Sequence, residues 1–153
     1  MSRRVFFSFH YENDIWRASQ VRNSWVTKPD RDSAGFWDAA SWESVKRKGD
    51  EAVKKWIWEQ MNGTSVTVVL IGSETASRPY VQYEIETSWD KKNGLIGVYI
   101  HNIKENDGRT STRGADPFAR YSNIKTYDWV NDSGYDNLGD WVEAAFDRAQ
   151  NRK

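Results

Sequence analysis

The sequence has no cysteine and only two histidines among its 153 residues. Without cysteine there is no disulfide framework and no thiolate metal site. The two histidines, His10 and His101, are a small set of ligands, which argues against a zinc or iron centre. We therefore expect no metal site.

The sequence also has no excess of charge of either sign, because 22 Lys and Arg residues balance 22 Asp and Glu residues. This balance argues against a nucleic-acid partner, which would favour a basic field. The longest apolar runs are too short to cross a bilayer, and no signal-peptide pattern follows the first arginines. We expect a cytoplasmic protein with no membrane partner, folded as one domain over residues 1–153.

Short aliphatic and aromatic runs predict the strands of a buried sheet. The run SVTVVLIG (65–72) has no polar alternation, which is typical of a central parallel strand buried on both faces. RVFFSF (4–9) and LIGVYI (95–100) have the same character. Weaker strands are expected at GFWDA (35–39) and within NIKTYDW (123–129).

Helical spacing of apolar residues predicts the segments between these strands. Helices are expected over about 13–25, 50–61 and 77–92, with a closing helix through 138–149 and a long exposed loop over 104–122. Strands that alternate with helices indicate an α/β fold with a parallel sheet. We predict a flavodoxin-like domain of about five parallel strands in the order 2-1-3-4-5, flanked by helices.

Two helix boundaries depend on single residues. Ser77 is suited to cap the helix that follows, with Pro79 tolerated in the first turn. Gly49 interrupts the pattern before Asp50, and it stays open whether that helix begins earlier, near Trp42.

In an open parallel sheet, ligands bind outside the carboxyl ends of the strands. Strand 1 ends at Ser8 to Tyr11, and both histidines lie at strand ends. For either histidine alone, a hydrogen-bonded position at the sheet edge is the simpler interpretation. Gly72 and Ser73 could offer backbone N–H groups to a phosphate. An ordinary turn is the simpler interpretation, because no glycine-rich fingerprint accompanies them.

Glu84 breaks an otherwise apolar stripe on the 77–92 helix, where it falls beside Val81, Ile85 and Ser88. An ionised carboxylate facing the sheet is costly unless a polar group or water meets it. Either this side chain lies at the core boundary, bonded for example to Ser8 or Tyr11, or it faces a ligand pocket. The residues alone leave both interpretations open.

Several of these segments together resemble Toll/interleukin-1 receptor (TIR) domains. RVFFSFHY is similar to their opening strand, and SRPYVQYEI is similar to their aromatic-x-x-x-Glu-hydrophobic motif. When VRNSWVT, TSVTVVLIG and TYDWV are included, the similarity extends from Arg4 to about Trp141. Over this range the chain resembles the TIR-like ThsB family of Thoeris anti-phage defence. Tyr80 and Val81 depart from the tryptophan and cysteine of many TIR enzymes, and the usual loop pattern after strand 2 is missing.

The resemblance implies an enzyme that cleaves the nicotinamide–ribose bond of NAD⁺ with Glu84 as its catalytic residue. Ring closure would then give a cyclic ADP-ribose isomer that activates a separate effector protein. NAD⁺ would be the substrate, and no cofactor is implied. A phage-derived trigger and a homo-oligomer are possible further partners. The expected substrate-binding residues are Phe6, Ser8, His10, Asp38, Trp42 and Tyr80.

Two other functions compete with this interpretation. The first is a catalytically inactive TIR-type interaction module, which would not require a buried carboxylate. The second is a nucleoside deoxyribosyltransferase-like enzyme, which also uses a glutamate on a flavodoxin-like sheet against an N-glycosidic bond. Turnover of deoxynucleosides would separate that enzyme from one that consumes NAD⁺.

Overall fold

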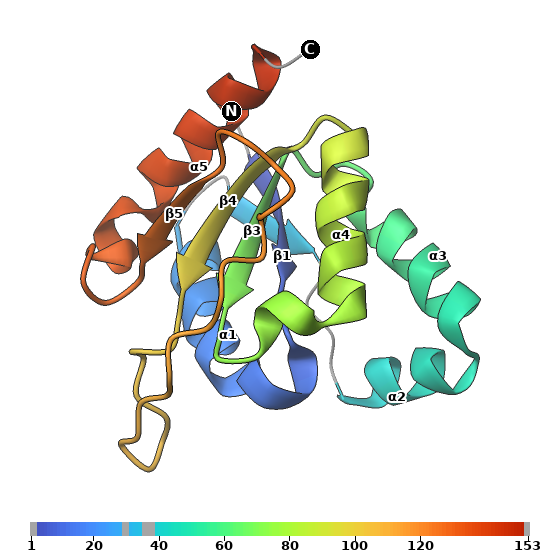
Figure 1. Cartoon of the computed structure of the whole chain (residues 1–153), viewed down its shortest axis with the longest axis horizontal. Helices are drawn as coiled ribbons and strands as arrows, with labels where there is room; N and C mark the ends of the chain where they lie inside the picture. The colour runs from blue at the N-terminus through green and yellow to red at the C-terminus, as the bar shows by residue number, and fades with distance from the viewer. Residues whose placement is uncertain (1–2, 29–30, 35–38, 152–153) are drawn as a thin grey trace.

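The computed structural model describes residues 3–28, 31–34 and 39–151. Within them, five strands form one parallel sheet in the order β2-β1-β3-β4-β5 (Figure 1). This order confirms the predicted α/β, flavodoxin-like arrangement. The strands are β1 (Arg3–Ser8), β2 (Arg31–Ala34), β3 (Val66–Ile71), β4 (Gly94–Tyr99) and β5 (Lys125–Asp128).

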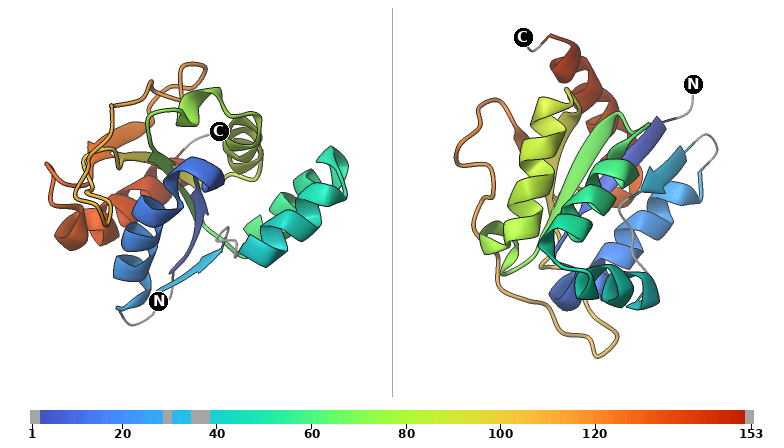
Figure 2. Two further views of the ribbon diagram at one scale, coloured as in Figure 1. Left: turned by 90° about the horizontal axis from the view of Figure 1, so that it is seen from below. Right: turned by 90° about the vertical axis from the view of Figure 1, so that its right-hand side faces the viewer.

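Helices cover both faces of this sheet (Figure 2). α1 and α5 contact each other on one face, and α3 and α4 do so on the other, with α2 packed beside α3. The helices are α1 (Tyr11–Val26), α2 (Ala39–Arg47), α3 (Asp50–Met61), α4 (Pro79–Asp90) and α5 (Gly134–Gln150), and a short 3₁₀ turn, η1 (Thr75–Ser77), precedes α4.

The central strands are buried on both faces, as their unbroken apolar runs predict. Every residue of β3 and of β4 is buried. Alternation in β1 sends Phe7 into the core beneath α1 and α5, while Phe6 packs beneath α3 against Ile57. Ser8 therefore shares the α3/α4 side with Phe6, the side on which the expected pocket lies.

The second strand of the structure lies earlier in the chain than the strand expected at 35–39. The second strand is β2, Arg31–Ala34, and α2 begins at Ala39, while residues 35–38 lie outside the described part of the chain. β2 pairs with β1 alone, at the edge of the sheet. An edge strand needs no continuous apolar run, and this one is secured by the Trp25 indole N–H, which donates to the backbone oxygen of Asp32 at 2.8 Å.

The structure places the two helix boundaries that were expected near Ser77 and Gly49. Ser77 does not cap α4: its hydroxyl donates back to the Glu74 carbonyl, and the residue before the helix is Arg78. Pro79 occupies the first turn as predicted. The segment near Trp42 forms a separate helix, α2, which ends before Gly49, whose φ of 101° suits glycine.

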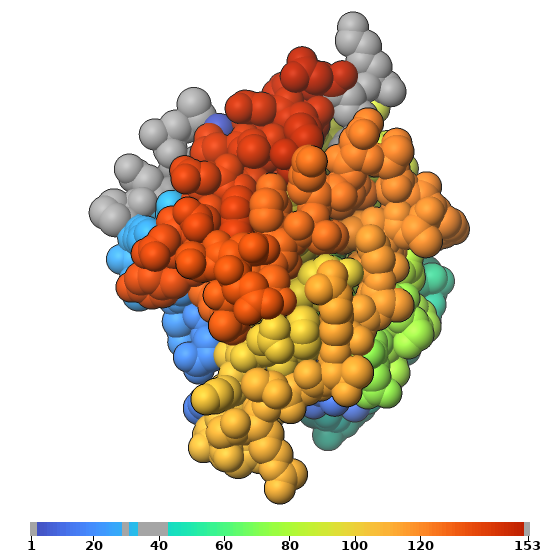
Figure 3. Space-filling model, turned by 60° about the vertical axis from the view of Figure 1, so that its left-hand side comes forward, coloured from blue at the N-terminus to red at the C-terminus, as the bar shows by residue number. Residues whose placement is uncertain are grey.

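The long connection between β4 and β5 contains no helix or strand, in agreement with the exposed loop predicted at 104–122. It runs over one face of the molecule in Figure 3. Arg17 of α1 holds its first part: the guanidinium donates to the carbonyls of Ile103 (2.7 Å) and Arg109 (3.1 Å) and pairs with Glu105 at 2.8 Å. No helix among the described residues is long and apolar enough to cross a membrane.

Gly94 lies where α5 packs closely on the sheet. A Cβ atom at this position would lie 2.6 Å from the backbone oxygen of Ala145. We predict that Gly94→Ala lowers the free energy of unfolding by about 1–3 kcal/mol, because backbone must move to admit the methyl group. Chemical denaturation measures this loss.

Gly139→Ala is the matched control. In α5 its added methyl group would meet the end of the flexible Arg31 side chain. Alanine is the better helix former by about 1 kcal/mol, so the control should be neutral or stabilising. Equal effects of the two substitutions would contradict this account of the α5–β4 contact.

Candidate active site

A cavity of about 320 Å³ opens at the carboxyl end of β1, between the first turns of α1 and α4. This is the edge of the sheet at which the parallel topology predicts a ligand site. Its size falls at the lower end of the range of roughly 300–1,000 Å³ for small-molecule sites. The lining residues are Phe9, His10, Tyr11, Glu12, Lys46, Asp50, Ile57, Arg78, Pro79, Tyr80, Val81 and Glu84.

Glu84 lies in the wall of this cavity with only 5% of its surface exposed. Val81, Ile85 and Ser88 are buried beside it, so the predicted stripe does face the sheet. The Ser8 hydroxyl, at the end of β1, donates to Glu84 Oε1 at 2.5 Å. The structure thus joins the two interpretations left open by the sequence: the carboxyl group is bonded to Ser8 and it also faces a cavity.

Burial raises the pKa of Glu84 to about 8, and the hydrogen bond from Ser8 opposes that rise. Apolar neighbours in the lining, such as Phe9, Ile57 and Val81, explain why desolvation dominates. At pH 7 the Glu84 carboxyl is therefore largely in its neutral form. A cation placed in the cavity would favour the carboxylate instead.

Hydrogen bonds beneath Glu84 fix this turn of α4 on β3. The Ser88 hydroxyl donates to the Glu84 backbone oxygen at 2.7 Å. With its proton used there, Ser88 accepts from the Thr67 hydroxyl, also at 2.7 Å. The position of the carboxyl group is thus set by both β1 and β3.

The rim of the cavity is charged and polar. The Tyr80 hydroxyl is hydrogen-bonded to Asp50. Burial is the larger cause of the raised pKa of Tyr80, and this hydrogen bond is the second cause. Lys46 pairs with Glu12 at 3.5 Å across the mouth. Arg78 adds an exposed guanidinium.

His10 also lines this cavity. Burial and the nearby Arg78 lower the pKa of His10, so its imidazole is neutral at pH 7. Its Nδ1 atom is buried and has no hydrogen-bond partner within the described part of the chain. A neutral imidazole suits hydrogen bonding to a ligand better than charge pairing.

Of the six expected substrate-binding residues, the structure brings His10 and Tyr80 to the cavity wall. Ser8 lies directly behind Glu84. Phe6 is fully buried under α3 and is not among the lining residues, so it supports the site from below. Asp38 and the side chain of Trp42 lie outside the described residues.

Sequence analysis missed Lys46, Asp50 and Arg78 as lining residues. The first two come from α2 and α3, and no motif indicates that these helices reach the mouth of the pocket. Arg78 had a usable signal, since it directly precedes α4 at the carboxyl end of the sheet.

Two other predicted features lie elsewhere. His101 contacts Tyr99 edge-on and is not among the lining residues of this cavity. The Gly72 N–H donates to the Thr75 hydroxyl at 2.8 Å, so the turn after β3 uses this donor internally. Across residues 3–28, 31–34 and 39–151, no group of three or more His, Asp or Glu side chains is arranged to hold a metal ion.

Comparison with known proteins identifies the family of the chain. Residues 6–105 match the family model described as Thoeris protein ThsB, TIR-like domain. The chain belongs to the ThsB TIR-like family. It is also 42% identical, over 143 residues, to a Bacillus cereus (strain MSX-D12) protein named "Putative cyclic ADP-D-ribose synthase ThsB1". That alignment covers 93% of this chain and 72% of the relative. The matched residues include both Ser8 and Glu84.

The raised pKa of Glu84 predicts how stability changes with pH. The folded chain keeps this proton up to about pH 8, whereas an unfolded glutamate loses it near pH 4.5. Between these values the folded state binds more protons, so its stability falls as pH rises. Glu84→Gln removes this titrating group. From pH 5 to pH 8, we expect the melting temperature of the variant to rise relative to that of wild type.

Glu86→Gln provides the control for this titration. Glu86 is exposed on the same helix, so its replacement shows what the loss of a glutamate from the surface of α4 does to the melting temperature. Parallel pH profiles for Glu84→Gln and wild type would show that the carboxyl group is not held in its neutral form.

Proposed function

We propose that this protein cleaves the nicotinamide–ribose bond of NAD⁺ and joins the ends of the remaining ADP-ribose into a cyclic isomer. The observation that carries the proposal is Glu84, a buried carboxyl group in the wall of a cavity at the carboxyl edge of the sheet. Family membership and the name of the Bacillus cereus relative support the same chemistry.

The reaction suits a single carboxylate. When the bond between ribose C1′ and the nicotinamide nitrogen breaks, its electron pair stays with nicotinamide, which leaves as a neutral molecule. No general acid is needed for this leaving group. C1′ develops the positive charge of an oxocarbenium ion, as in glycoside hydrolysis. Glu84 as a carboxylate would stabilise that charge in a site with little water.

The resting proton on Glu84 fits this role. Burial favours the neutral carboxyl. The substrate brings a positively charged nicotinamide ring, which would lower the pKa of Glu84 and favour its ionised form. Substrate binding would thus generate the carboxylate where it is needed, and Ser8 would hold it by its hydrogen bond.

The cavity is too small for the whole dinucleotide, so we assign it to the nicotinamide and its ribose. The diphosphate would lie at the rim, where Lys46 and Arg78 supply positive charge. Tyr80 offers a ring against which the nicotinamide can stack, and His10 offers a hydrogen-bonding nitrogen. Phe6 would shape the floor from beneath.

Ring closure requires an atom of the ADP portion to reach C1′ before water does. The new bond forms from a lone pair on that atom, and any proton it carries is released to solvent. A closed, dry cavity favours this outcome over hydrolysis to linear ADP-ribose. The cyclic product would diffuse to a separate effector in the cytoplasm, and a phage-derived trigger would switch the enzyme on.

The direct test compares wild type, Glu84→Gln and Glu86→Gln incubated with NAD⁺, with and without lysate of phage-infected cells. We expect Glu84→Gln to lose on the order of a thousandfold in turnover, as when one main electrostatic stabiliser is removed. Glu86→Gln should keep wild-type activity, because its side chain points to solvent. Mass spectrometry identifies the products.

Near-normal turnover by folded Glu84→Gln would overturn the assignment of the catalytic residue. NAD⁺ that stays intact in every sample, with a phage that the system senses, would favour an interaction module. A parallel incubation with deoxynucleosides tests the remaining alternative. Exchange of their bases, without loss of NAD⁺, would indicate a deoxyribosyltransferase-like enzyme.

A further inference from the structure

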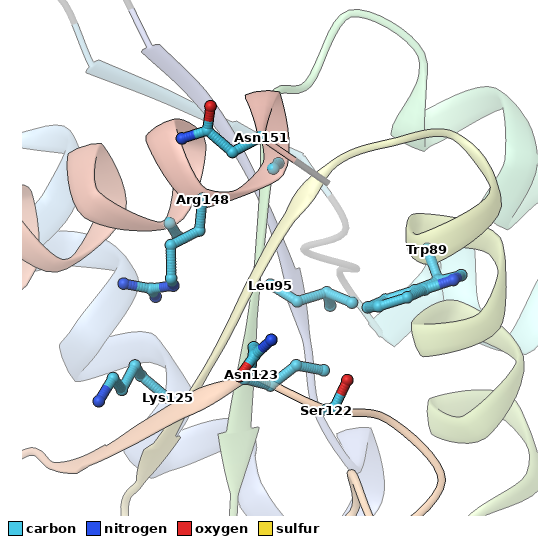
Figure 4. A pocket seen from close by; sticks show the side chains of 10 residues that line it. Trp89, Leu95, Ser122, Asn123, Lys125, Arg148 and Asn151 are labelled. Atoms are coloured by element: carbon cyan, nitrogen blue, oxygen red, sulfur yellow. The ribbon is translucent and has the colours of Figure 1, made fainter. Parts of the chain in front are cut away.

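A second cavity, of about 640 Å³, lies at the opposite edge of the sheet from Glu84. It is enclosed by the last turns of α4 and α5 and the first residues of β4 and β5 (Figure 4). Nothing in the proposed NAD⁺ chemistry uses it. Its lining residues are Trp89, Leu95, Ser122, Asn123, Ile124, Lys125, Ala145, Arg148, Ala149 and Asn151.

Two positive side chains line this cavity. Arg148 extends from α5 toward the side of the cavity where Lys125 of β5 lies (Figure 4). Neither forms an ion pair with an acidic side chain of the described residues. The Nη2 atom of Arg148 is also buried without a hydrogen-bond acceptor among them. A buried donor without an acceptor is costly, and an anion in the cavity would satisfy it and pair with both positive side chains.

The other walls differ in character from this positive one. Trp89 lies across the cavity from Arg148 (Figure 4) and is tilted against Tyr121, with ring centroids 5.1 Å apart. Leu95 adds an apolar floor that is almost completely buried. Asn123 and Asn151 contribute amide groups that can both donate and accept hydrogen bonds.

We propose that this cavity binds a small nucleotide-like ligand. Its phosphate would be held by Arg148 and Lys125, and its flat ring would pack on Trp89 and Leu95. A guanidinium binds phosphate through two parallel N–H groups, and a neighbouring ammonium adds a point charge. A single aromatic wall opposite a pair of cations matches a molecule with a ring at one end and an anionic group at the other. The volume of the cavity is within the range of small-molecule sites.

The test is isothermal titration calorimetry with AMP as the probe, because AMP has one ring system and one phosphate. Adenosine and inorganic phosphate are titrated separately. We expect AMP to bind wild type, and we expect Arg148→Gln and Lys125→Gln each to weaken its binding at least tenfold. Both variants should melt no lower than wild type, because each removes a positive charge that has no acidic partner among the described residues.

Two control variants locate the binding. Lys55→Gln removes an exposed cation of α3 that lines neither cavity, and Arg78→Gln removes the exposed guanidinium at the Glu84 cavity. Lys55→Gln should bind AMP as wild type does. Arg78→Gln should keep the binding that Arg148→Gln loses, even if the Glu84 cavity also takes up AMP in wild type. Loss of AMP binding in Arg78→Gln but not in Arg148→Gln would place the nucleotide at the Glu84 cavity and overturn the proposal.

The component titrations decide the class of ligand. Adenosine binding as tightly as AMP would show that the cations take no part. Inorganic phosphate binding as tightly as AMP would show that the aromatic wall takes no part, so either result contradicts a nucleotide site. Absence of AMP binding at millimolar concentration would also overturn it. None of these outcomes depends on whether Glu84 cleaves NAD⁺.

Discussion

The hydrogen bond between Ser8 and Glu84 is the contact on which the active-site geometry depends. It joins the end of β1 to the middle of α4, across the point where the strand order of the sheet reverses. α4 must bury Val81 and Ile85 to pack on the sheet, and helical spacing then carries Glu84 inward with them. The carboxyl group is buried because its helix has no other way to pack, and the hydroxyl of Ser8 makes that burial tolerable.

The parallel topology separates the molecule into two edges with different chemistry. The carboxyl ends of the strands hold a buried carboxyl group under a rim of mixed charge. The amino ends hold two cations, neither of them ion-paired within the described part of the chain, beside an aromatic wall. α4 connects them, since Tyr80 and Glu84 lie at one cavity and Trp89 at the other. One helix thus contributes to both sites from opposite ends.

Most of this fold could be predicted from the sequence, because β3, β4 and α5 have apolar patterns that suit only one structure. β2 could not, since a polar edge strand leaves no such pattern and is defined by its pairing with β1. The candidate active site was likewise predictable only in part. Glu84 is conspicuous because a carboxylate interrupts an apolar stripe. Lys46 and Asp50 reach the rim through the tertiary placement of α2 and α3, which no local pattern encodes.

The central claim is that Glu84 is a buried, largely neutral carboxyl group poised to ionise when a cation enters its cavity. Carboxyl ¹³C NMR of protein labelled at glutamate, with the Glu84 resonance assigned by its loss in Glu84→Gln, measures the pKa of this group directly. The account predicts titration near pH 8. Titration near pH 4.5, the ordinary value of a glutamate, would contradict it.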